Sequence, residues 1–139
     1  MRILYSLLPL LIAIAGCASS SKHNGDQQQT FANLVQLEKP GNTAHQPSNV
    51  YIDSVKQIKA NNQPALLISG TFPDACTKLE DVSHSISNDS LHIQIKAWRN
   101  PKEMCAQVLT PFSFIYDKLT REELSSHSEV FINSTAYSY

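Results

Sequence analysis

Three observations predict an all-β fold class, a small β-sandwich of six or seven strands, for residues 49–139 of this 139-residue chain. Short runs that alternate apolar and polar residues follow one another, and turn-forming residues separate them at fairly regular spacing. Two distant cysteines in the same region, Cys76 and Cys105, are candidates for a disulfide. The chain length allows one domain of this size.

The first four predicted strands form two pairs. Residues 50–58 and 65–72 are joined across residues 61–64, and residues 81–86 and 90–98 are joined by the two-residue turn Asn88-Asp89. The second turn sets three cross-strand pairs, which are Ile86 with Leu91, His84 with Ile93 and Val82 with Ile95. One face of this hairpin is therefore predicted to be apolar and the other polar.

The same register decides a question about metal binding. His84 and His92 lie close together in the sequence, but in this hairpin their side chains point to opposite faces. A zinc pair would need a register shifted by one residue, which would turn the apolar residues to solvent. We therefore predict no metal site here, with His84 partly buried and His92 in solvent.

The next predicted strand, residues 106–117, carries the strongest alternation in the chain. Phe112, Phe114 and Tyr116 share one face of it. Pro111 lacks a backbone N–H, so it indicates a bulge or a sheet edge near the start of this strand.

A short helix and the last strands complete the predicted domain. Thr120 and Glu123 have the spacing of a capping box, which predicts a single helical turn. Residues 129–139 predict a terminal strand or two. Together with one disulfide, these elements indicate a sandwich that is immunoglobulin-like in outline. A compact barrel is the alternative, because alternation alone does not distinguish the two.

The N-terminus has the plan of a secretory leader. Met1-Arg2 is a short positive region, and residues 3–15 form an uncharged, mainly apolar run that is too short to span a bilayer as a helix. Ile14-Ala15-Gly16-Cys17 resembles the lipobox of bacterial lipoproteins, in which the cysteine carries a diacylglycerol. This resemblance implies a signal peptide over residues 1–16 and lipidation at Cys17.

Lipidation would hold the mature chain on a membrane. Several acyl chains, such as palmitate, anchor stably because each buried methylene contributes about 0.8 kcal/mol. Ala18 after the cysteine, rather than Asp, resembles the outer-membrane class of lipoproteins. We therefore expect a bacterial cell-envelope protein on the outer membrane, facing the periplasm. The alternatives are an ordinary Cys17 thiol after a plain secretory leader, or a buried helix, which Gly16 and the polar residues after Cys17 disfavour.

Lipidation of Cys17 would also explain why the chain has an odd number of cysteines. Lipidation of Cys17 leaves Cys76 and Cys105 as a pair, and an oxidising envelope favours their disulfide. Closing a loop of about 29 residues would stabilise the fold by about 3 to 4 kcal/mol in the chain-entropy picture. Neither cysteine lies in a CxxC motif or has a histidine at a ligand spacing, so we predict no metal and no cofactor.

Residues 17–48 predict a lipidated N-terminus followed by a flexible tether, because Ser and Gln runs alternate with Pro and Gly. Its apolar residues are Phe31, Leu34, Val35 and Leu37. They indicate either one amphipathic turn that docks on the domain or a partner, or a locally apolar piece of tether or an edge strand before the domain.

A second resemblance covers roughly residue 70 to the end of the chain. Gly70-Thr-Phe-Pro-Asp-Ala-Cys76, Met104-Cys105-Ala-Gln and Leu109-Thr-Pro-Phe112 are similar to a pattern in small bacterial envelope lipoproteins of unassigned function. The resemblance supports the fold and the disulfide and implies no activity. Residues 121–128 depart from it, because a tighter glycine-containing turn is expected there.

Charge and motifs disfavour several classes of function. A formal net charge of -1 with 17% charged residues indicates no nucleic-acid partner. The chain has no Gly-x-Ser-x-Gly motif, and its 4 glycines do not form a phosphate-binding loop. The acidic pairs Glu80-Asp81 and Glu122-Glu123 are adjacent residues whose side chains diverge in a strand or lie on a solvated turn. We therefore predict that the protein is not an enzyme.

The remaining hypothesis is a protein that binds a protein partner or supports an envelope assembly. Sheet edges accept strands and aromatic side chains anchor interfaces, so Trp98, Tyr137 and Tyr139 are the candidate partner-binding residues. Core packing is the competing interpretation of the same aromatics. The alternative functions are a periplasmic ligand-binding or hydrolytic lipoprotein, and an enzyme inhibitor.

Overall fold

The computed structural model describes residues 30–139. The predicted signal peptide, the lipidation at Cys17 and the first part of the tether lie outside the described residues. Eight strands and one short helix follow in chain order within the described part: β1 (Gln46–Ser48), β2 (Tyr51–Ala60), β3 (Gln63–Phe72), β4 (Lys78–Ser87), β5 (Ser90–Arg99), β6 (Thr110–Tyr116), α1 (Arg121–Ser126), β7 (Glu129–Ile132) and β8 (Thr135–Ser138).

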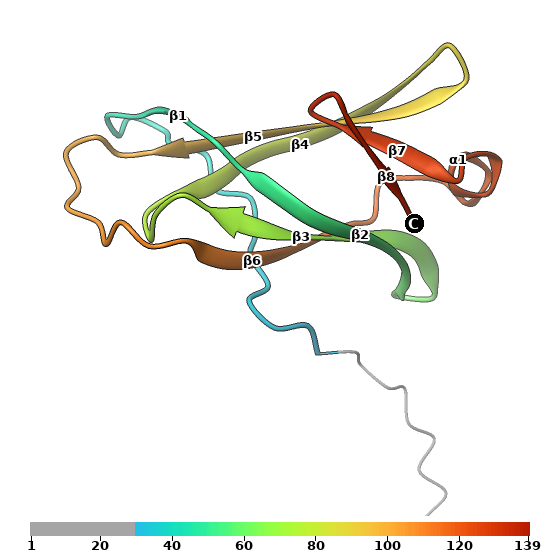
Figure 1. The fold of residues 1–139 in the computed structure, drawn as a ribbon, viewed down its shortest axis with the longest axis horizontal. Helices are drawn as coiled ribbons and strands as arrows, with labels where there is room; N and C mark the ends of the chain where they lie inside the picture. Colours follow the sequence, from blue (N-terminus) through green and yellow to red (C-terminus); the bar gives the residue numbers. More distant parts are fainter. Residues whose placement is uncertain (1–29) are drawn as a thin grey trace, which may run out of the picture.

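The strands form two sheets that face each other (Figure 1). One sheet has three antiparallel strands in the order β2-β3-β6. The other has five strands, in which β5 pairs with β4 along one edge and with both β1 and β7 along the other, and β8 follows β7. The predicted all-β sandwich is confirmed, with eight strands in place of six or seven, and it is not the single closed sheet of a barrel.

The core lies between the two sheets. Its buried side chains come from both layers and from the segment around α1: Val55, Leu66, Ile68, Phe72, Leu79, Val82, Leu91, Ile93, Ile95, Ala97, Phe112, Tyr116, Leu119, Leu124, Val130 and Ile132. The predicted apolar face of β6 contributes Phe112 and Tyr116 fully, and Phe114 is half-buried against the same core. Strand β6 starts at residue 110 rather than 106, and Pro111 lies near its start on an edge of the sheet.

Three hairpins share one turn geometry. Their two turn residues all have positive φ angles: Asn61 and Asn62, Asn88 and Asp89, and Asn133 and Ser134. Positive φ at both positions matches the twist of the flanking strands, and Asn and Asp tolerate it best among residues other than glycine. The structure confirms the predicted pairs of the second hairpin, Ile86 with Leu91, His84 with Ile93 and Val82 with Ile95.

The two histidines of that hairpin point to opposite faces, as predicted, because His84 pairs with Ile93 while Ser85 pairs with His92. His84 is half-buried, also as predicted. The prediction that His92 lies in solvent is wrong. Strand β7 brings Phe131 opposite His92, and the two rings stack with centroids 5.1 Å apart, so His92 is half-buried.

Asn133 completes the ladder where β1 and β7 leave a gap on β5. β7 pairs with residues 91–93 and β1 with residues 97–99, so Ile95 lies between them. The Asn133 side chain accepts a hydrogen bond from the Ile95 N–H at 2.9 Å and donates one to the Ile95 carbonyl at 3.1 Å. One side chain thereby satisfies both backbone groups of a strand residue, as a neighbouring strand would.

Helix α1 begins at the predicted capping box. The Thr120 hydroxyl accepts from the Glu123 N–H at 3.2 Å, and the Glu123 carboxylate accepts from the Thr120 N–H at 2.7 Å. The buried side chain of Leu124 fixes the helix to the core. No helix within residues 30–139 is long and apolar enough to cross a bilayer.

The predicted boundary between tether and domain, at residues 48 and 49, is too late. Strand β1 lies in the predicted tether and pairs with the end of β5. Residues 33–38 also contact both sheets through backbone hydrogen bonds. Of the two interpretations of the apolar residues in the tether, the docking on the domain is observed but the helical turn is not: Leu34 forms an isolated parallel bridge with Ser113, and Val35 packs against the core.

Candidate functional site

Residues 33–38, which we call the strap, join the edges of the two sheets on one side of the sandwich. At its first end, the Val35 N–H donates to the Ser113 carbonyl at 2.9 Å and the Ser113 N–H donates to the Asn33 carbonyl at 2.8 Å. At its other end, the Glu38 N–H donates to the Leu79 carbonyl at 2.7 Å. The strap therefore covers the edge of β6 and then the edge of β4.

A polar cluster holds the second end of the strap. The Trp98 indole N–H donates to the Glu38 carbonyl, and the Glu38 carboxylate forms an ion pair with Lys78. The Lys78 ammonium also lies 5.5 Å from the centre of the Trp98 ring, within the range of a cation–π contact. These contacts leave Trp98 only 5% exposed.

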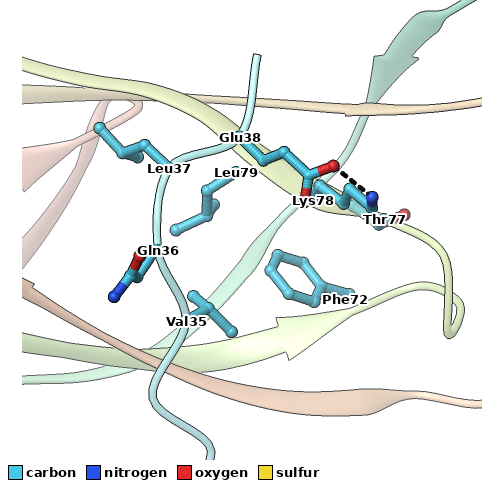
Figure 2. Close-up of a pocket in the computed structure, with 8 residues that line it drawn as sticks. All are labelled: Val35, Gln36, Leu37, Glu38, Phe72, Thr77, Lys78 and Leu79. Atoms are coloured by element: carbon cyan, nitrogen blue, oxygen red, sulfur yellow. Dashed lines mark hydrogen bonds and ion pairs between the residues drawn. The ribbon is translucent and has the colours of Figure 1, made fainter. Parts of the chain in front are cut away.

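A half-open groove with a volume of about 460 Å³ lies between the strap, the end of β3 and the start of β4 (Figure 2). Its lining residues are Val35, Gln36, Leu37, Glu38, Phe72, Thr77, Lys78 and Leu79. Figure 2 shows the side chains of Val35, Phe72 and Leu79 grouped beneath the strap, with the Glu38–Lys78 ion pair at one end. The groove is therefore lined by apolar and polar side chains in similar measure, with one ion pair at its rim.

The strap also presents apolar side chains to solvent. Leu34 is 51% exposed and Leu37 is 37% exposed, and Leu37 is itself a lining residue of the groove. Apolar side chains that gather on the surface beside a groove are a feature of surfaces that bind another molecule.

Asp74 organises the loop that borders this groove. One carboxylate oxygen accepts from the N–H groups of Cys76 and Thr77 and from the Thr77 hydroxyl, and the other accepts from Arg99 at 3.0 Å. Burial alone would raise the pKa of Asp74. The hydrogen bonds from Cys76 and Thr77 and the Arg99 charge outweigh burial and hold the pKa below its ordinary value.

The predicted disulfide is present in the same loop. Cys76 and Cys105 are bonded, with Cα atoms 5.7 Å apart, and they join the loop after β3 to the loop after β5. Beside the disulfide, the Ala75 N–H donates to the Ala106 carbonyl at 3.1 Å, so the two loops are also joined by their backbones.

A second cluster of titratable side chains lies at α1. Nδ1 of His84 and the Tyr116 hydroxyl share a hydrogen bond of 2.6 Å, and Nε2 of His84 lies 3.5 Å from the Glu123 carboxylate. Burial, and then the charges of Asp81 and Glu123, raise the pKa of Tyr116. Hydrogen bonds from the Thr120 backbone and hydroxyl hold the pKa of Glu123 below its ordinary value. All three polar side chains are engaged with each other, so this cluster fastens α1 to β4 and β6.

Comparison with known proteins gives the family of this domain. The pattern of the ORF11 beta-sandwich domain matches residues 66–138, which is just over half of the chain. The chain belongs to the ORF11 beta-sandwich domain family. The match runs from β3 to β8 and includes both bonded cysteines, whereas the strap, β1 and β2 precede it. Neither a curated protein nor a solved structure matches the chain significantly.

The ORF11 beta-sandwich domain does not bring the three predicted partner-binding aromatics together. Trp98 is buried beneath the strap end, as described above. Tyr137 lies in β8 and Tyr139 follows it, and both are half-buried. Their hydroxyls donate to the carbonyls of Ile52 and His127 at 3.3 and 2.9 Å, respectively. The structure therefore gives no shared exposed patch of these aromatics.

The groove in this ORF11 beta-sandwich domain was not predicted from the sequence, although one signal for it was present. The apolar residues of the predicted tether, among them Val35 and Leu37, line the groove. An apolar cluster in an otherwise polar linker indicates docking, but it does not give the strands on which the cluster docks. Phe72 and Leu79 form the other wall, and in the sequence they are indistinguishable from the remaining core residues.

Proposed function

We propose that this protein is a non-enzymatic lipoprotein of the bacterial envelope, held on a membrane through Cys17, whose ORF11 beta-sandwich domain binds a protein partner at the strap. The groove carries this proposal. Its lining combines apolar with polar side chains, its rim has one ion pair, and the strap beside it exposes Leu34 and Leu37. Such a site suits an extended partner segment that inserts one or two apolar side chains.

The chemistry of the described residues favours binding over catalysis. The groove is lined by one acidic and one basic side chain, Glu38 and Lys78, and these are paired with each other. The His84, Tyr116 and Glu123 cluster does not line the groove, and its polar atoms are engaged in mutual contacts. An active site needs titratable groups that converge on a space where a substrate fits.

The lipid anchor is supported by the lipobox-like residues that end at Cys17. Only 16 residue steps separate Cys17 from Asn33, where the strap begins. An extended chain of that length reaches at most about 55 Å. A partner that binds at the strap would therefore lie near the membrane surface that holds the lipid.

In-cell crosslinking tests the partner and its binding surface together. We would crosslink intact cells that express the wild-type protein, extract with detergent and identify the proteins that co-purify. Leu37→Asp places a charge in the groove at a half-exposed position, so we expect it to reduce the captured partner while the domain stays folded. Ile86→Asp is the matched control, because Ile86 is 47% exposed but lies at the other end of β4. Equal capture by both variants would reject the groove as the binding site.

Membrane fractionation tests the anchor separately. We expect Cys17→Ser to release the protein from membranes, since the thiol that carries the lipid is gone. Persistence of this variant in a carbonate-washed membrane pellet would reject the lipid anchor.

A second candidate function is the binding of a small apolar ligand. The groove volume of about 460 Å³ favours it, because small-molecule sites commonly have volumes of about 300 to 1,000 Å³. A reproducible absence of any crosslinked partner, with groove variants that alter ligand binding, would support this function in place of the first.

A further inference from the structure

The disulfide loop contains a set of potential metal ligands. The sulfur atoms of Cys76 and Cys105 and a carboxylate oxygen of Glu103 all lie within 4.8 Å of one another. Both cysteines are half-buried and Glu103 is exposed, so each side chain has room to rotate. In the oxidised protein the two sulfurs are bonded to each other and do not act as thiolate ligands.

We propose that reduction of the Cys76–Cys105 disulfide creates a Zn²⁺ site formed by the two thiolates and the Glu103 carboxylate. Zn²⁺ binds sulfur at about 2.3 Å and carboxylate oxygen at about 2.0 to 2.2 Å, so ligand atoms of a tetrahedral site lie about 3.6 to 3.8 Å apart. The present separations are compatible with that geometry after side-chain rotation. Water takes the fourth position, because Glu103 is exposed.

The two loops stay together without the disulfide, because other contacts join them. The Ala75 N–H bonds the Ala106 carbonyl, next to each cysteine. Asp74 holds the backbone of Cys76 and is bonded in turn to Arg99, which ends β5 just before the second loop. The cysteine backbones therefore keep their relative position when the sulfur–sulfur bond breaks. A preformed arrangement of this kind lowers the cost of metal binding.

The reaction that opens the site is thiol–disulfide exchange with a dithiol reductant. The reductant gives two electrons and two protons, its own two sulfurs become bonded, and Cys76 and Cys105 become thiols. Zn²⁺ then displaces the two thiol protons into solvent and binds the two thiolates and the carboxylate. The metal thereby takes over the cross-link between the two loops.

Zinc titration of the purified full-length chain tests the proposal. The oxidised and the reduced protein would compete with a chromophoric chelator for Zn²⁺, and the fluorescence of Trp98, the one tryptophan of the chain, would report whether the fold is kept. Cobalt absorption on the reduced protein would report thiolate ligands in a tetrahedral site. We expect one Zn²⁺ per reduced chain and none per oxidised chain.

Four variants separate the proposed site from other zinc binding. Cys76→Ser leaves the Cys105 thiol without its partner thiolate, so we expect it to lose the site. Glu103→Gln should weaken binding by about tenfold or more, since even residues that only support metal ligands contribute tenfold or more to affinity. Glu122→Gln removes the same charge at exposed α1 and should bind as the wild type does. Cys105→Ser should match Cys76→Ser.

Three results would overturn the proposal. The first is equal zinc binding by Cys76→Ser and the wild type, which would indicate other ligands. The second is equal affinity of Glu103→Gln and Glu122→Gln, which would remove the carboxylate from the site. The third is unfolding of the reduced protein that Zn²⁺ does not reverse, because the site requires the two loops to stay together.

Discussion

Gly70 in β3 is a position where even one methyl group is expected to disrupt the sandwich. It pairs with Ile52 of β2 on one side and with Phe112 of β6 on the other. A Cβ atom at this position would lie 2.2 Å from the Tyr51 carbonyl oxygen and 3.0 Å from the Phe112 ring. The carbonyl belongs to the backbone, so no side-chain rotation relieves the contact.

The expected cost of Gly70→Ala follows from these distances. Carbon and oxygen atoms of this kind approach to about 3.3 Å, so β2 must move away from β3 by about 1 Å. Such overpacking costs about 1 to 3 kcal/mol, and a weakened hydrogen bond between the strands adds about 1 kcal/mol. The smaller conformational freedom of alanine in the unfolded chain returns about 0.4 to 1 kcal/mol. The net loss of unfolding free energy is about 2 kcal/mol, a large fraction of the about 5 to 15 kcal/mol of a whole domain.

Urea unfolding followed by Trp98 fluorescence measures this loss, because the indole is buried and its environment changes on unfolding. Gly41→Ala is the matched control: Gly41 has a φ of 56° but nothing within 4 Å of the added methyl group. That variant should lose only about 1 kcal/mol, the cost of a left-handed backbone for alanine. A loss at Gly70 no larger than the loss at Gly41 would refute the argument from close approach.

Two further predictions concern the polar groups that join the strands. Asn133→Gly keeps the positive φ but removes both hydrogen bonds to Ile95. We expect it to lower the free energy of unfolding, measured in urea, by about 2 kcal/mol. Asn62→Gly, at a turn of the same geometry, should lower it far less. Asp74 has a folded-state pKa below its ordinary value of 3.8, so the folded protein binds fewer protons there and stability is lost as the pH falls below about 3.8. Asp74→Asn should destabilise the protein by about 3 kcal/mol at neutral pH, because Arg99 loses its charged partner. The variant should also lose less stability than the wild type as the pH falls. An unchanged loss of stability in acid would show that Asp74 is not the group responsible.

Local patterns were sufficient to predict the hairpins and their register. The second hairpin has a two-residue Asn-Asp turn between runs with one apolar face, and turn and face both select the same register. The capping box at Thr120 and Glu123 was predictable for a related reason, because the two residues that form it are three positions apart. In each of these elements the interacting residues are close in sequence.

Strand β1 was not predictable on the same basis. It has three residues, Gln46, Pro47 and Ser48, with no apolar alternation, and it pairs through its backbone with a strand about 50 residues away. A polar run that contains proline is compositionally a linker. Its place in the sheet depends on the edge that β5 leaves free beyond β7, and this is a property of the assembled sheet.

The position of Trp98 explains both why the start of the domain was predicted too late and why the groove was not predicted. Ala97 belongs to the core between the sheets and Trp98 does not, so alternation along β5 directs the indole to the outer face of its sheet. The indole would therefore be exposed if no other segment covered that face. The chain after the strap instead crosses this face, from Glu38 at the edge of β4 to β1 at the other edge of β5, and it covers the indole on the way. The segment that the sequence predicts to be a flexible tether thus buries Trp98, the predicted partner-binding residue. The strap and the groove beside it are exposed instead, and they lie near the end of the described chain that leads to Cys17.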